Sequence, residues 1–361
     1  IHLRLWRAVN RPLETYGCFF EMPASKGYSF DVLSAAFFCL SRYEEYQPYE
    51  PDLYDRYPHT QSIAYQHGFL HQPLVNIWLC DLAEQLQHVF PGFILQAPAF
   101  RWIPTYDIDM AWSYRHKGWL RNVGGFLRHP SFERFQVLLG SRLDPFDCFD
   151  WLDDLHTAHQ LHPLYFFLAA AKRGRYDKNI PPDHPAMRKL IRHHARRYHL
   201  GWHPSWQHFN NQPEWAKEKS GLETAAGQFI RQSRQHYIHL HLPETYRQLM
   251  AMGITDDYSM GYGSINGFRA SVAYPFPWYD LLQECSTDLQ LHPFAYMDAN
   301  SHYEQRQSVD ASYDELMRYF QLCRSYHGTL ISIFHNPFLG TDPQFAGWRD
   351  LYQRFIAQVP R

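Results

Sequence analysis

Residues 102–109 read WIPTYDID, a short apolar run that ends in two acids. The apolar run predicts a strand over residues 102–106. Asp107 and Asp109 are two residues apart, so their side chains point to one side while the strand geometry lasts. Neighbouring carboxylates repel each other, and a bound cation relieves that repulsion. The stretch therefore indicates a metal ion and a base at a strand end; the alternative is a helix N-cap beside a surface acid.

Short apolar strands and longer amphipathic helices alternate from this stretch onward. We expect further strands over residues 164–168, 200–203, 237–240, 258–260, 289–295 and 330–334. We expect helices over residues 149–159, 185–198, 215–233, 245–252, 312–326 and 345–357. Repeated strand–helix units predict an α/β fold with a parallel sheet. About seven strands in this length suit an irregular (β/α) barrel better than an open sheet.

The beginning of the chain has a different pattern. A helical run covers residues 30–46, with Asp31 placed to cap it, and a second covers residues 73–89. A polar stretch rich in Tyr, Pro and Asp separates them, and residues 91–98 have the composition of a linker. We therefore expect a smaller N-terminal α+β domain of unknown role over residues 1–97 and a catalytic barrel over residues 98–361.

Composition narrows the class of protein. The chain has 361 residues, of which 45% are hydrophobic, and a formal net charge of −2, which is not the basic balance typical of nucleic-acid binding. No apolar run approaches the ~20 residues of a membrane helix. Aromatic residues make up 17% of the chain; they fill the core first, and some are candidates for platforms under sugar rings.

The six cysteines lie far apart and form no C-x-x-C pair, which argues against a thiolate zinc site. Free thiols suit a reducing compartment, so we expect a cytoplasmic protein. The chain begins Ile1-His2-Leu3-Arg4, which has the features of neither a signal peptide nor a natural start. We expect the true N-terminus to lie upstream.

Four more candidates for chemistry lie near strand ends, where α/β proteins place their active sites. His203 ends one predicted strand, His236 precedes another, Arg269 is flanked by small residues, and His335 ends the last strand. Alone, each has a structural alternative: a buried, hydrogen-bonded histidine, a cation at a helix C-terminus, or an ordinary salt bridge. Together with Asp109, the first two give the donor set of a catalytic zinc or a similar divalent ion. Asp107 and His335 then remain as base and acid for metal-assisted hydrolysis.

The order and context of these residues resemble the polysaccharide deacetylases, the NodB-homology or carbohydrate esterase family 4 group. The resemblance covers about residues 98–361. More closely, the chain looks like bacterial members that carry an uncharacterised N-terminal domain, to which residues 40–46, LSRYEEY, look similar. The resemblance implies a distorted barrel of parallel strands and helices.

Residue by residue, the resemblance also implies roles. Residues 105–109 match the family's first motif, with Asp107 as general base and Asp109 as metal ligand, and His203 matches the first histidine of the second motif. Arg269, with Pro and Phe downstream at 275 and 276, resembles the third motif, in which an arginine orients the base. His335 matches the general acid of the last motif.

Two departures from the family pattern bear on the site. Ile108 separates acids that are usually adjacent, and Gln207 stands where the second motif has its second histidine. We favour His236 as the second nitrogen ligand, with His208 as the alternative. Candidate substrate contacts are Tyr176, Asp177 and Lys178, together with Asp298. The alternative for the loop that holds the first three is a polar loop without a role.

The function that the resemblance implies is zinc-dependent removal of an N-acyl group from an amino sugar in a poly- or oligosaccharide. The expected acyl group is acetyl. The partner would then be a carbohydrate. Two alternatives stay open. One is hydrolysis of a non-sugar amide on the same fold. The other, suggested by the altered second motif, is a non-catalytic carbohydrate-binding protein.

Overall fold

The computed structural model describes residues 4–7, 15–18, 20, 30–92, 94, 96–128 and 131–359. The chain packs into two compact units. The first unit comprises Ile1–Trp102, Tyr237–Arg306 and Asp314–Ser332, and the second comprises Ile103–His236, Gln307–Tyr313 and Ile333–Arg361. The fold is mixed α/β with mostly parallel strand pairing, as the sequence predicts. Closure of the strands into a barrel stays a prediction.

Parallel strands form the centre of the second unit. Strands β3 (Arg101–Ile108), β4 (Leu164–Leu168), β5 (His199–His203) and β6 (Gln232–Ser233) pair in that order. Strand β11 (Thr329–His335) lies on the other side of β3. Because β3 to β6 run in one direction, their carboxyl ends reach the same edge of the sheet.

The register of these strands depends on one close approach. Every residue of β4 is buried, which explains its uninterrupted apolar sequence LYFFL. Phe166 in β4 lies opposite Gly201 in β5, and a Cβ atom at Gly201 would lie 2.2 Å from the Phe166 ring. Only glycine therefore allows β5 to pair here and to bring His203 opposite Leu168.

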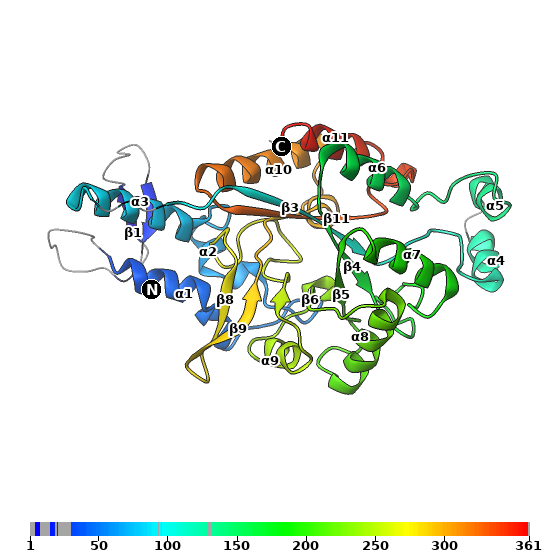
Figure 1. Cartoon of the computed structure of the whole chain (residues 1–361), viewed down its shortest axis with the longest axis horizontal. Coiled ribbons are helices and arrows are strands. Elements are labelled where there is room, and N and C mark those ends of the chain that lie inside the picture. The colour runs from blue at the N-terminus through cyan, green and yellow to red at the C-terminus, as the bar shows by residue number, and fades with distance from the viewer. Residues whose placement is uncertain are drawn as a thin grey trace. The chain divides into compact units, whose positions relative to one another are not determined.

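Four of the helices described in the second unit overlap predicted ones, and the two that precede residue 149 were not predicted. The helices of this unit are α4 (Trp119–Arg128), α5 (Phe132–Leu138), α6 (Phe149–His159), α7 (Pro185–Ala195), α8 (Gln212–Ala226) and α11 (Trp348–Ile356). Helices α7 and α8 lie side by side (Figure 1). Asn211 caps the start of α8, and Gly227, with a φ of +74°, ends it. The predicted helix over 215–233 therefore stops short of the residues that form the site.

The first unit contains the described N-terminal elements and most of a second group of strands. Its helices are α1 (Val32–Leu40), α2 (Ile63–Gln66), α3 (Leu74–Val89), α9 (Glu244–Ala251) and most of α10 (Val309–Ser325). Its strands are β1 (Arg4–Arg7), β2 (Thr15–Cys18), β7 (Asp256–Asp257), β8 (Phe276–Asp280), β9 (Cys285–Leu291) and β10 (Tyr296–Met297). β7 pairs with β9 in parallel, whereas β8 pairs with β9 antiparallel. Asp31 caps α1 as predicted, accepting from the Ser34 amide at 3.0 Å.

A buried ion network ties the N-terminal region to residues 261–271. Arg269 donates to both carboxylate oxygens of Glu45, at 2.8 and 2.5 Å, and Arg42 donates to Glu45 at 2.7 Å. The backbone adds a bond from the Phe268 amide to the Leu70 carbonyl. The division of the chain by packing therefore differs from the boundary at residue 97 that composition favours.

We expect the Glu45→Gln variant to lose about 3–5 kcal/mol of unfolding free energy, because the buried Arg269 would lose its charge partner. The buried Arg42 would also lose one of its two carboxylate partners and keep Glu44. Burial opposes the charged form of Glu45, but Arg269 and Arg42 lower its pKa to about 2. Its stabilisation is therefore present above the unfolded pKa and is lost as pH falls toward 2. Urea denaturation at neutral and acid pH measures both effects.

The control for this prediction is Glu50→Gln, which changes an exposed glutamate a few residues further along the chain. An equal and small change in both variants would contradict the structural role of Glu45.

Several predicted strands are placed differently in the structure. The strand predicted over 237–240 is wrong: β6 ends at Ser233, and residues His236–Ile238 form a 3-10 turn. Tyr237 and Ile238 have φ values of +58° and +54°, which a strand cannot contain. β7 and β9 begin before the predicted strands over 258–260 and 289–295, and β8 was not predicted.

The structure also gives the state of the cysteines. Cys39, Cys80, Cys148, Cys285 and Cys323 are free thiols, and the side chain of Cys18 lies outside the described residues.

Among the helices in the described ranges, none has the length and apolar character needed to cross a membrane.

Candidate metal centre

Three donors meet at the carboxyl edge of the strands in the second unit. Asp109 follows β3, His203 is the last residue of β5, and His236 lies just beyond β6. Nε2 of His203 lies 3.3 Å from Oδ1 of Asp109, and Nε2 of His236 lies 3.5 Å from Oδ2. Ligands about 2.1 Å from a tetrahedral zinc ion lie about 3.4 Å from one another. The three donors are therefore spaced as the ligands of one ion would be.

The surroundings of these donors also fit a cation. Both imidazoles are buried, whereas the Asp109 side chain is 26% exposed, which leaves access for water or a substrate. Among the described residues, no donor makes a well-directed hydrogen bond to the buried Oδ1 of Asp109. Two imidazoles and a carboxylate with an open position are the donor set of catalytic zinc sites.

Hydrogen bonds to the far side of each ring aim the histidines at Asp109. Nδ1 of His203 contacts the Arg234 carbonyl at 2.5 Å, so Nδ1 carries the proton and Nε2 faces the site. Nδ1 of His236 lies 2.9 Å from Oδ1 of Asp177. Asp177 is itself buried and accepts from the backbone amides of Trp206 and Gln207 at 2.9 and 3.1 Å. Such outer contacts fix the ring orientation of metal ligands.

The electrostatics agree with a site made for positive charge. Burial opposes ionisation of Asp109, yet His236 and His203 hold its pKa well below the usual value. Burial alone would lower the pKa of His236, but Asp109 and Asp177 raise it to about 9. The two carboxylates therefore favour positive charge at this position.

We expect Asp177→Asn to weaken metal binding about 10–100-fold, because the amide cannot fix the His236 ring as the carboxylate does. Titration of the metal-depleted protein with Zn²⁺ measures the change. The control is Asp183→Asn, an exposed aspartate six residues further along. Unchanged affinity in the Asp177 variant would mean that His236 needs no such support.

Arg234 and Asp107 form a buried ion pair beside the three candidate metal ligands. Nη1 of Arg234 donates to Oδ1 of Asp107 at 2.7 Å, and both side chains are buried. The Arg234 guanidinium also lies over the Phe166 ring, 4.2 Å from its centroid. Arg234 therefore holds Asp107 by a contact that excludes water from one side of the carboxylate.

The arginine beside Asp107 is not the one that the family resemblance implies. Arg269 bonds to Glu45 and to the Gly261 carbonyl, within the first unit. Arg234 was not among the residues predicted for the site. The signal that could have found it is its spacing: Arg234 lies two residues before His236, as Asp107 lies two before Asp109.

His335 lies at the end of β11, with Nε2 3.8 Å from Oδ2 of Asp109. The next residue, Asn336, is buried and donates to the carbonyls of Met110 and Phe146 at 3.0 and 2.9 Å. Asn336 thereby fixes the end of β11 to the loop that follows β3. Asn336 was not among the residues predicted for the site.

Of the two histidines considered for the second nitrogen ligand, His236 lies with Asp109 and His203. Nδ1 of His208 instead lies 2.9 Å from the buried Glu218 carboxylate of α8. Ser205 donates to the same carboxylate at 2.5 Å. The residues after β5 are thus bound to α8.

Of the four residues expected to contact substrate, one contacts a candidate metal ligand and the other three make contacts elsewhere. The Tyr176 ring packs edge-on against Trp206, and Nζ of Lys178 donates to the Gly174 carbonyl at 2.8 Å. Asp177 supports His236, a contact with the site that the sequence did not suggest. Asp298 is buried in the first unit, where Oδ1 accepts from the Ala299 amide at 2.6 Å. Substrate binding by these residues stays a prediction.

Comparison with known proteins gives two kinds of likeness. Residues 3–91 match a family described as "Family of unknown function (DUF7033)", and these residues include the LSRYEEY stretch. No curated protein matches the chain.

Among solved structures, the chain is similar to polysaccharide deacetylases. A candidate polysaccharide deacetylase from Mycobacterium smegmatis is 12% identical with a TM-score of 0.46, and the match covers 74% of this chain and 87% of that one. A polysaccharide deacetylase from Bacillus cereus is 9% identical with a TM-score of 0.35, over 72% and 87% of the two chains. A mutant of a carbohydrate esterase family 4 pseudoenzyme with restored activity is 12% identical with a TM-score of 0.34, over 72% and 68%.

Proposed function

We propose that this chain is a metal-dependent hydrolase that removes N-acyl groups from an amino sugar in a poly- or oligosaccharide. The acyl group that we expect is acetyl. The observation that carries the proposal is the convergence of Asp109, His203 and His236 on one point, within a few ångströms of His335. Beside this group, Asp107 is held by a buried arginine. This grouping of candidate ligands, base and acid supports the proposal of a hydrolase.

Asp109, His203 and His236 would hold a divalent ion such as zinc, which when bound supplies Lewis-acid polarisation of the scissile amide. Asp107 would take the proton of the attacking water. Its Oδ1 is engaged by Arg234, and we assign the water to Oδ2. His335 would give a proton to the leaving amine of the sugar. The part-exposed side of Asp109 is the side from which the substrate would enter.

The direct test is acetate release from an N-acetylated glucosamine oligomer by the metal-loaded protein. We expect release that stops when a chelator removes the ion and returns when Zn²⁺ is restored. Simple acetylated amides, assayed in parallel, separate sugar substrates from other C–N bonds. Glycan binding without any hydrolysis, by protein that carries its ion, would contradict the enzyme and favour the carbohydrate-binding alternative.

A further inference from the structure

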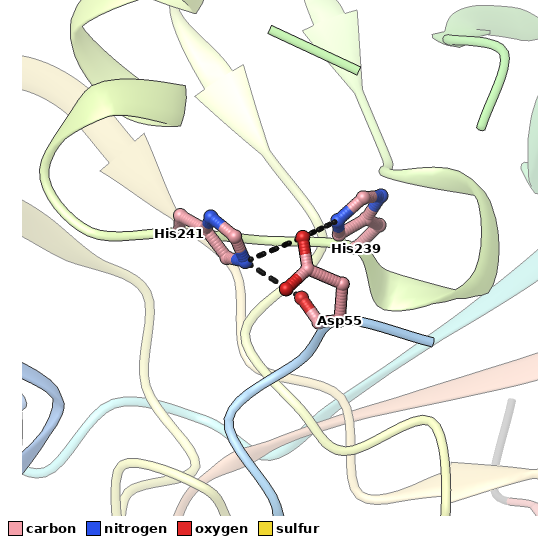
Figure 2. Close-up of side chains that lie close together, drawn as sticks. All are labelled: Asp55, His239 and His241. Carbon is pink, nitrogen blue, oxygen red and sulfur yellow. Dashed lines mark hydrogen bonds and ion pairs between the residues drawn. The ribbon is translucent and has the colours of Figure 1, made fainter. Parts of the chain in front are cut away.

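A second group of metal-type donors lies in the first unit and shares no residue with the candidate metal centre. It consists of Asp55, His239 and His241. Figure 2 shows both imidazoles pointing at the Asp55 carboxylate. Nε2 of His239 lies 3.3 Å from Oδ2 of Asp55, and Nε2 of His241 lies 3.5 Å from the same atom. Nε2 of His241 also lies 2.6 Å from the Asp55 carbonyl oxygen.

The local backbone builds this group from two segments. His239 and His241 are two residues apart, and their rings converge with centroids 5.3 Å apart and planes at 84° rather than stacking. Asp55 has a φ of +59°, a conformation that aspartate tolerates better than most residues. The Asp55 amide donates to the Asp52 carbonyl at 2.9 Å, which closes the turn that presents it.

Arg56 joins the two segments. Its Nε donates to the Asp52 carboxylate at 2.8 Å, and its Nη1 donates to the Tyr237 carbonyl at 2.9 Å. The Tyr54 and Tyr237 rings pack at 5.0 Å beside it. The turn that carries Asp55 is therefore fixed against the segment that carries the histidines before any ion binds.

The distances suit metal ligands, although the contact of His239 with Asp55 is also a long hydrogen bond. Separations of 3.3 and 3.5 Å lie beyond the usual range for a nitrogen–oxygen hydrogen bond, of about 2.7–3.2 Å. They match the ligand separation of about 3.4 Å around a tetrahedral zinc ion. The Asp55 side chain is 53% exposed, so an ion can enter from solvent and keep water ligands.

We propose that Asp55, His239 and His241 form a second site for a divalent transition-metal ion of the zinc class. Two imidazole nitrogens and a carboxylate select such ions over Ca²⁺ or Mg²⁺, which prefer oxygen ligands. Ligation through Nε2 of His241 needs the neutral tautomer with its proton on Nδ1, so the hydrogen bond from Nε2 to the Asp55 carbonyl would be given up for the ion. The ion would cross-link the region that matches the family of unknown function to residues 237–241, and it would thereby stabilise the first unit.

The test is the ion content of the full chain, loaded with Zn²⁺ after metal depletion and then dialysed. We expect about two ions per chain in the wild type, and about one in both His241→Gln and Asp55→Asn. His292→Gln is the matched control, because His292 pairs with Asp256 at 2.7 Å outside both groups of donors. It should bind as many ions as the wild type.

An Asp109→Ala variant separates this proposal from the proposed function. The variant should still bind about one ion, which a further His241→Gln change removes, and that ion should raise its melting temperature. An Asp109→Ala chain that binds no ion would overturn the second site. So would equal ion contents in the wild type, His241→Gln and Asp55→Asn proteins.

Discussion

An Asp107→Asn variant should lose acetate release by roughly 10²–10⁴-fold, the usual contribution of a general base, while it keeps its ion. The amide cannot take a proton from water. It still offers Arg234 an oxygen, so the buried arginine keeps a partner at the position where Asp107 now accepts at 2.7 Å. Turnover assays with parallel elemental analysis measure the two effects separately.

The control for this prediction is Asp154→Asn, an exposed aspartate on α6 that should leave both activity and ion content unchanged. Circular dichroism establishes that each variant is folded. Full turnover by folded Asp107→Asn would exclude Asp107 as the base and would leave water activation to another group. Loss of the ion in this variant would instead assign Asp107 to the ligands.

His236→Gln should lose one ion per chain and all measurable turnover, whereas His208→Gln should keep both. Nε2 of His236 faces Asp109, while Nδ1 of His208 is bound to Glu218. Glutamine retains a side-chain donor for Glu218, so the exchange at 208 should leave the loop after β5 folded. Ion content and acetate release of the two variants, measured together, test the assignment.

Asp109→Asn provides a second variant for the same site at a part-exposed position, where a folding defect is less of a concern. It should lose the same ion as His236→Gln. An ion that persists in His236→Gln and disappears in His208→Gln would reverse the assignment of the second nitrogen ligand.

Local sequence patterns located the strand ends that carry most of the proposed site. The apolar run before Asp107 became β3, and the runs before His203 and His335 became β5 and β11. The helix predicted over residues 149–159 has the same bounds in the structure. These predictions succeed because strand and helix periodicity depends on neighbouring residues, and a parallel sheet brings its carboxyl ends to one edge.

The segment from 227 to 241 shows where local patterns fail. Its apolar residues suggested a strand over 237–240, but Tyr237 and Ile238 adopt left-handed backbone conformations. The short β6 lies earlier, and it places Arg234 and His236 at the site. Nothing in the adjacent sequence specifies the positive φ values, which the packing of the segment selects.

The sequence by itself determined the α/β class, the acids after the first strand, and the histidines at 203 and 335. Only the tertiary structure decided which arginine meets Asp107 and which histidine joins Asp109. Arg234 lies 127 residues from Asp107 along the chain, and Arg269 lies 224 residues from Glu45. A buried charged side chain needs an oppositely charged partner, and the tertiary fold determines which residue lies close enough to pair with it. Contacts between residues so far apart in the chain leave no local pattern in the sequence.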